Sequence, residues 1–190
     1  MGASDFEKKC GKAVQVNMRT AVITVSDKGS RGERDDASGR SILERLTAGG
    51  YDVVFQAVVP DEADQIAALL RTCADEEKIA LVVTTGGTGV GVRDVTPEAT
   101  LSVLDRTVPG MAEAMRAASL LKTPHAMISR AVAGIRGGTL IVNLPGSPKG
   151  AMENLDVLMP ALPHALAKIQ GDPSDCASAD TPQGKEGRLV

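Results

Sequence analysis

Residues 79–99 constrain the fold more than any other stretch, because an apolar run, a glycine-rich loop and a helix start follow one another there. Residues 79–83 are apolar and partly β-branched, which is typical of a strand covered on both faces. The loop that follows contains Gly86, Gly87, Gly89 and Gly91. A backbone so poor in side chains can reach positive φ and let a ligand approach closely.

The loop ends at Thr96-Pro97-Glu98, which predicts a helix N-terminus with Thr96 as N-cap and Pro97 at the first helical position. Backbone N–H groups that converge after a strand favour an anion site. Arg93 and Asp94 stand at its rim. The alternative is a plain strand-to-helix turn without a ligand, which seldom contains this many glycines beside Arg-Asp.

The remaining chain alternates apolar runs with amphipathic segments. Strands are predicted at residues 20–25, 53–59, 129–135 and 139–144, and helices open near residues 36, 62, 96, 111 and 151. Gly137-Gly138 fits a hairpin turn between the last two strands. The alternation predicts an α/β fold whose mostly parallel sheet carries helices on both faces.

One domain is expected over residues 19–170. Residues 1–18 are polar and predict a flexible N-terminal arm. From residue 171 to 190 the composition shifts to Gly, Pro, Ser, Asp and Thr, which favours a disordered tail.

Composition narrows the classes of partner. Aromatic residues are 2% of the 190 residues and the net charge is −3, which argues against a stacking platform for nucleic acid. The chain shows no apolar run long enough for a membrane span and no signal-peptide core, so we expect a cytoplasmic protein. Cys10, Cys73 and Cys176 are widely spaced and are expected to stay reduced, without a disulfide or zinc role.

Polar loops follow the predicted strands at their C-terminal ends, which share one crevice in a parallel sheet. These loops carry Ser26-Asp27, Asp61, the 86–94 segment, and the 143–149 segment with Lys149. Acids beside phosphate-binding loops make chemical sense when a divalent metal lies between them. The pattern therefore predicts phosphoryl or nucleotidyl transfer on a small molecule.

Ordinary structural roles remain open for several of these residues. Ser26 and Asp27 suit turn chemistry, Asp61 suits a helix cap, and Lys149 suits a solvated position after a proline turn. Neither glycine loop matches GxxxxGK[ST], and the first also fails the dinucleotide pattern GxGxxG, which disfavours both of those enzyme classes.

Two long segments resemble the MogA/MoaB family of molybdopterin-binding proteins. They are residues 84–99, TTGGTGVGVRDVTPEA, and residues 129–150, SRAVAGIRGGTLIVNLPGSPKG. The resemblance extends over roughly residues 19–170 and implies a compact three-layer α/β/α fold, usually trimeric. It implies molybdenum cofactor biosynthesis, in which Mg²⁺ and ATP serve to adenylylate molybdopterin with release of pyrophosphate.

Carried over position by position, the resemblance makes Asp61 and Asp94 the catalytic acids and the residues that hold Mg²⁺. Contacts with the pterin or the nucleotide are implied for Ser26, Asp27, Thr85, Gly86, Gly87, Thr88, Gly89, Arg93, Asn143, Pro145, Gly146, Ser147 and Lys149. The product is expected to pass to a molybdate-inserting enzyme.

Three other functions compete with this one. The first is a non-catalytic molybdopterin-binding protein of the MoaB kind. The second is an enzyme of the competence-damage kind acting on another nucleotide, and the third is a purely structural oligomer. Molybdopterin-dependent turnover of ATP separates the first from the enzyme.

Overall fold

The structure is a computed structural model that describes residues 18–173. The predicted N-terminal arm, except Met18, and the predicted tail from residue 174 onward lie outside the described residues, as do Cys10 and Cys176. Within residues 18–173, no helix combines the length and the apolar character needed to cross a membrane.

The centre of the molecule is a six-stranded sheet in the order β2-β1-β3-β6-β5-β4. Its strands are β1 (Arg19–Val25), β2 (Asp52–Val59), β3 (Leu81–Thr85), β4 (Arg106–Thr107), β5 (Ala133–Arg136) and β6 (Thr139–Leu144). The pairs β1–β2, β1–β3 and β3–β6 are parallel, whereas β4–β5 and β5–β6 are antiparallel. The mostly parallel sheet is therefore confirmed, and Gly137, with φ of 52°, turns the β5–β6 hairpin.

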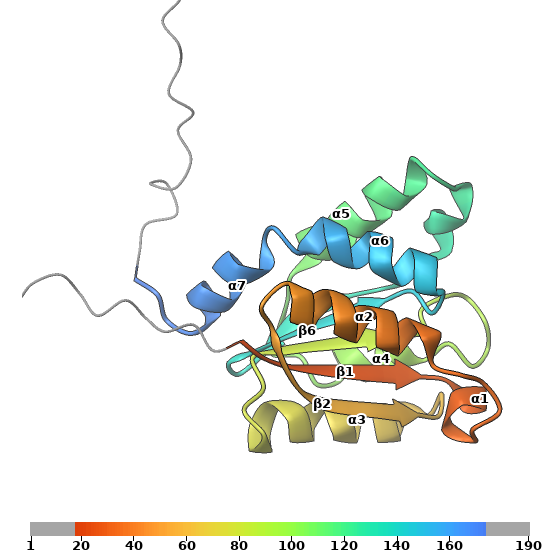
Figure 1. The fold of residues 1–190 in the computed structure, drawn as a ribbon, viewed down its shortest axis with the longest axis horizontal. Coiled ribbons are helices and arrows are strands. Elements are labelled where there is room, and N and C mark those ends of the chain that lie inside the picture. The colour runs from red at the N-terminus through yellow and green to blue at the C-terminus, as the bar shows by residue number, and fades with distance from the viewer. Residues whose placement is uncertain (1–17, 174–190) are drawn as a thin grey trace, which may run out of the picture.

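Helices cover both faces of the sheet, so the three-layer arrangement is confirmed (Figure 1). One core lies under α2 (Ala37–Ala48), α5 (Pro109–Leu120), α6 (Pro148–Leu158) and α7 (Leu162–Ile169). The other lies under α3 (Ala63–Arg71), the π-helical turn η2 (Thr72–Glu76) and α4 (Thr96–Leu101). The short α1 (Asp27–Ser30) and the 3₁₀ helix η3 (Pro124–Ile128) complete the described elements.

The two cores consist mainly of aliphatic side chains. Ile42, Leu46 and Leu155 fill the first, and Ile66 and Leu70 fill the second, each with at most 1% of its surface exposed. Cys73 is a free thiol in the second core, and burial raises its pKa to about 11. Such a thiol is inert at neutral pH.

The parallel strands end at the same level. Val25 of β1 pairs with Val59 of β2, and Thr24 pairs with Thr85 of β3, which in turn pairs with Leu144 of β6. The loops after these strand ends therefore leave from one edge of the sheet, as the sequence predicts. This edge is where open α/β sheets bind ligands.

The predicted helix start at Thr96 is wrong in detail. Val95 is the N-cap, and Thr96 lies inside the first turn with Pro97 after it. The Thr96 hydroxyl is buried and accepts no capping hydrogen bond, and the backbone N–H of Thr96 donates to the carbonyl of Gly87 at 3.1 Å.

Two strand predictions also differ from the structure. The predicted strand at residues 129–135 begins only at Ala133, because Arg130 turns away to donate its N–H to the carbonyl of Thr88 at 2.9 Å. The two-residue β4, which pairs with β5 at the sheet edge, is absent from the predicted strands. The two residues Arg106 and Thr107 are too few and too polar for their sequence to predict a strand.

Candidate functional site

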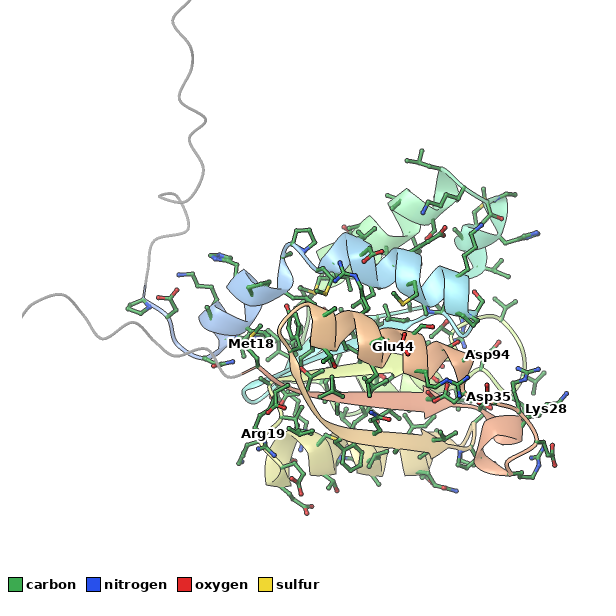
Figure 2. All side chains as sticks on the ribbon, in the orientation of Figure 1. Met18, Arg19, Lys28, Asp35, Glu44 and Asp94 are labelled. Carbon is green, nitrogen blue, oxygen red and sulfur yellow. The ribbon has the colours of Figure 1, made fainter. Side chains whose placement is uncertain are left out.

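A cavity of about 570 Å³ opens at the edge where the parallel strands end. The predicted site residues in its wall are Ser26, Asp61, Thr85, Gly86, Gly87, Asp94, Gly146 and Ser147. The wall also contains a segment that the sequence did not single out, Arg34 to Ser38, just before and within the first turn of α2. Figure 2 shows Asp94 and Asp35 together at this end of the molecule, with Met18 and Arg19 at the opposite end.

The first two loops are joined by a reciprocal pair of hydrogen bonds. The backbone N–H of Asp27 donates to Oδ2 of Asp61 at 2.8 Å, and the backbone N–H of Asp61 donates to Oδ1 of Asp27 at 3.1 Å. Ser26 adds a backbone bond to the carbonyl of Val59 at 2.8 Å. Asp61 is therefore not the N-cap of α3, a position that Glu62 occupies without a side-chain cap.

Arg93 fastens the glycine loop to this pair. Its Nε and Nη2 donate to the Asp27 carboxylate at 3.1 and 3.0 Å, and Nη2 also donates to Glu62 at 2.7 Å. The hydrogen bonds from Arg93 hold the pKa of Asp27 below its usual value. The same carboxylates raise the pKa of Arg93, so this cation is fully committed within the protein.

Asp61 has the opposite electrostatic character. Burial is the largest cause that raises the pKa of its carboxyl group, opposed by the hydrogen bond from Asp27, and the negative charges of Asp27 and Asp94 add to the rise. Raised carboxyl pKa values in clefts are common at functional sites. Asp61 and Asp94 both line the cavity, so one ligand there can meet both acids.

Asp94 closes the glycine loop upon itself. Its Oδ2 accepts a hydrogen bond from the backbone N–H of Gly91 at 2.7 Å. A methyl group added at Gly89 or Gly91 would lie 2.9 or 2.8 Å from that same oxygen. These two glycines therefore make room for the carboxylate of Asp94.

The first two glycines of the loop have a different task. Gly86 and Gly87 adopt φ of 103° and 60°, which side chains disfavour. A methyl group on Gly86 would lie 2.2 Å from the carbonyl oxygen of Val25, and one on Gly87 would lie 2.4 Å from Oγ1 of Thr96. The turn thus requires glycine at both positions.

The Thr96 hydroxyl is a buried polar group without a hydrogen-bond partner among residues 18–173. It faces the same side of Gly87 as Oδ1 of Asp61, which a methyl group on Gly87 would approach to 3.0 Å. An unsatisfied buried hydroxyl costs stability, and such costs collect at functional sites.

Two helices begin at the cavity. Ser147 caps α6 through a hydrogen bond from the N–H of Gly150, and Asp36 caps α2 through one from Gly39. The hydroxyl of Ser38 joins the two by donating to the carbonyl of Gly146 at 2.8 Å, and Thr85 donates to that of Pro145 at 2.7 Å. The positive ends of two helix dipoles therefore point toward one space, which favours an anionic ligand.

Some predicted site residues lie outside the cavity wall. Asn143 is fully buried, and its amide donates to the hydroxyls of Thr84 and Thr100, both at 2.9 Å, so it holds β6 to β3 and α4. Thr88 and Gly89 offer their carbonyl groups to Arg130. Lys149 is exposed and makes no ion pair within the described part of the chain.

The carboxylates fit a divalent cation. Asp61 and Asp94 line one cavity, and each keeps one oxygen that no described residue engages. No group of three or more His, Cys, Asp or Glu side chains suited to a metal occurs within residues 18–173. Mg²⁺ is commonly held by one or two carboxylates together with substrate phosphates, so two acids suffice for it.

The fold and the cavity together define an α/β domain suited to an anionic, phosphate-bearing small molecule. A family model described as "Probable molybdopterin binding domain" matches residues 21–164, and the chain belongs to that family. The resemblance inferred from the two motifs is thereby confirmed.

Named relatives cover most of this chain. The molybdopterin adenylyltransferase of Helicobacter pylori strain 26695 is 43% identical over 153 residues, covering 80% of this chain and 87% of the relative. That of Escherichia coli K12 is 42% identical over 142 residues, covering 73% and 72%. The crystal structure of the molybdopterin biosynthesis enzyme MoaB from Thermus thermophilus is 54% identical, with a TM-score of 0.78, covering 82% and 98%.

Replacing Gly87→Ala is expected to impair the site. The left-handed φ costs about 1–2 kcal/mol for a residue with a side chain, and the new methyl group would also push Thr96 aside. Binding of a phosphate-bearing ligand such as inorganic pyrophosphate, measured by titration calorimetry, should weaken at least tenfold. Thermal unfolding should show that the fold persists. The control is Gly110→Ala, where no atom lies within 4 Å of the new methyl group; equal binding by the two variants would contradict this account of the turn.

Replacing Asp61→Asn should stabilise the protein. Because the pKa of Asp61 is raised on folding, the folded state holds this proton more tightly, so stability falls as pH rises through the folded-state pKa. At neutral pH the amide removes that penalty and can still accept the bond from Asp27. We expect the unfolding midpoint to rise by roughly 1–3 °C at pH 7, and the gain to shrink as pH falls through that pKa.

Asp27→Asn is the control of opposite sign, because the pKa of Asp27 is lowered by Arg93. Its removal should lower the unfolding midpoint at pH 7. Both variants moving in the same direction would refute the electrostatic contrast between the two acids.

Proposed function

We propose that this protein transfers an adenylyl group from ATP to the phosphate of molybdopterin, releasing pyrophosphate, as a step in molybdenum cofactor biosynthesis. The observation that carries the proposal is the pair Asp61 and Asp94 in one cavity beside two helix N-termini. The relatives named molybdopterin adenylyltransferase, which match most of the chain, support the same reaction.

In the proposed reaction, an oxygen of the molybdopterin phosphate attacks the α-phosphorus of ATP. The bond from that phosphorus to the oxygen bridging to the β-phosphorus breaks, and the electron pair leaves with pyrophosphate. Bound Mg²⁺, held by Asp61 and Asp94, would neutralise charge on the phosphates. The chain itself has to position the two substrates, since phosphoryl transfer depends on alignment and electrostatics.

The backbone supplies the binding groups. The glycine turn at Gly86-Gly87 presents peptide groups without side-chain bulk, and the first turns of α2 and α6 add N–H donors. Thr85 and Ser38 fix these segments to one another through their bonds to the carbonyls of residues 145 and 146. A rigid frame of this kind keeps the donors in place before the substrate arrives.

Arg93 and Asp27 have a supporting role in this proposal. Because the two side chains pair with each other, their charges are not available to the substrate. The pair also positions Asp61, which accepts a hydrogen bond from the Asp27 backbone N–H. Lys149, exposed beside the start of α6, is available to a phosphate at the rim. Asn143 does not contact the substrate in this proposal. It is buried and links β6 to β3 through its hydrogen bond to Thr84.

Pyrophosphate release from Mg-ATP, measured with and without molybdopterin, tests the proposal. Release should require molybdopterin, and Asp94→Asn should lower the rate at least ~100-fold, because one of the two carboxylates proposed to hold Mg²⁺ is lost. Asp52→Asn, at the far end of β2, is the matched control and should retain full activity. Tight molybdopterin binding without any release would instead establish the non-catalytic binding protein.

We also propose a homotrimer, an expectation that comes from the family resemblance. Apolar side chains exposed after α5 support a contact between chains: Leu121, Met127 and Ile128 are 89%, 72% and 50% exposed. Light scattering should give three times the mass of one chain, and a single-chain mass at micromolar concentration would reject the trimer.

The reaction is proposed to run in the cytoplasm, because ATP is its co-substrate. Adenylyl-molybdopterin is an activated product with a phosphoanhydride bond. It is proposed to pass to a molybdate-inserting enzyme, which would consume it.

A further inference from the structure

The cavity has an imbalance of charge that the proposed function does not resolve. Its wall contains the carboxylates of Asp35, Asp36, Asp61 and Asp94, and Arg34 is the cation among the lining residues. Phosphate-bearing substrates enter this space as anions, and the carboxylates of the wall repel them. A cation in the wall would attract them and offset that repulsion. The ion pairs of the nearby arginines show which guanidinium group is available to the substrate.

The neighbouring arginines are already engaged. Arg93 is shared between Asp27 and Glu62, and Arg31 forms a bidentate pair with Glu33 at 2.8 and 3.0 Å. Arg40 forms a bidentate pair with Asp35. Each of these guanidinium groups would have to give up a protein partner before it could bind a ligand.

Arg34 differs from these arginines in its hydrogen bonds and ion pairs. Within residues 18–173 it makes neither a hydrogen bond nor an ion pair. The acids that follow it in the chain are occupied: Asp35 is bound by Arg40, and Asp36 accepts from the Thr24 hydroxyl at 2.8 Å and from the Gly39 N–H at 2.8 Å. The guanidinium of Arg34 therefore keeps all of its donors for a ligand.

The backbone below Arg34 is firmly held. Asp36 fixes the start of α2 to β1 through Thr24, and Ser38 fixes it to the loop after β6 through Gly146. An arginine on such a base loses less freedom on binding than one on a loose loop. Its planar fork matches two oxygens of a phosphate group, close to the positive end of α2.

We propose that Arg34 is a substrate-binding residue that contacts a phosphate group of the ligand in this cavity. The inference deepens the proposed function, on which its choice of substrates rests. A phosphate there has two sources, the polyphosphate of the nucleotide and the phosphate of molybdopterin. The ligand used in each measurement separates them.

The test compares Arg34→Gln with the intact protein in binding and in turnover. Calorimetry measures the Kd of Mg-ATP and of inorganic pyrophosphate, and fluorescence titration measures that of molybdopterin. Loss of one guanidinium–phosphate contact should weaken at least one of these about tenfold and make that Kd less sensitive to salt. Arg34→Lys should recover part of the loss, because it restores the charge without the fork.

Arg31→Gln is the matched control, since Arg31 lies outside the cavity wall and is paired with Glu33. It should leave all three Kd values within about twofold of the intact protein. The thermal unfolding midpoint of Arg34→Gln should not change, because Arg34 contacts no partner in the described part of the fold. Weaker nucleotide and pyrophosphate binding assigns Arg34 to the nucleotide, and weaker molybdopterin binding assigns it to the pterin phosphate.

Unchanged Kd values and salt dependence for all three ligands in Arg34→Gln would overturn the inference. The binding measurements need no turnover, so they stand apart from the fate of the proposed reaction. An intact protein that releases no pyrophosphate, but whose ligand binding depends on Arg34, would refute the adenylyl transfer and retain this residue's role.

Discussion

The reciprocal hydrogen bonds between Asp27 and Asp61 are the interaction on which the site depends. They join the ends of β1 and β2 through backbone N–H groups, so the position of the Asp61 carboxylate follows from the register of the sheet. Arg93 brings the glycine loop to the same point by its pair with Asp27. Three loops from distant parts of the chain are thus fixed around one cavity by backbone geometry and by the ion pairs of one arginine, Arg93, with Asp27 and Glu62.

Several features of the site are locally unfavourable to the stability of the fold. Asp61 is partly buried with a raised pKa, the Thr96 hydroxyl has no partner among the described residues, and Gly86 and Gly87 hold left-handed conformations. The two aliphatic cores on either side of the sheet supply the stability that tolerates these features. Strain and unsatisfied groups therefore gather at the cavity, and the rest of the domain stays regular.

Much of the fold was predictable from local pattern. The strands at 20–25, 53–59 and 139–144 and the helix that opens near residue 36 appear as expected, because apolar runs and helix caps act within a few residues. The predictions failed where distant partners decide. Thr96 lies one residue inside the helix, with its backbone N–H on the carbonyl of Gly87, and residues 129–132 left the sheet because Arg130 binds the glycine loop.

The sequence by itself determined the alternating α/β order, the glycine turn and the family, because each is written in neighbouring residues. Only the tertiary structure decided which polar residues face the ligand. It buried Asn143 between Thr84 and Thr100, paired Arg93 within the protein, and left Arg34 unpaired among the described residues of the cavity wall. The physical reason is that ion pairs and burial depend on which loops meet in space, and spacing along the chain does not carry that information.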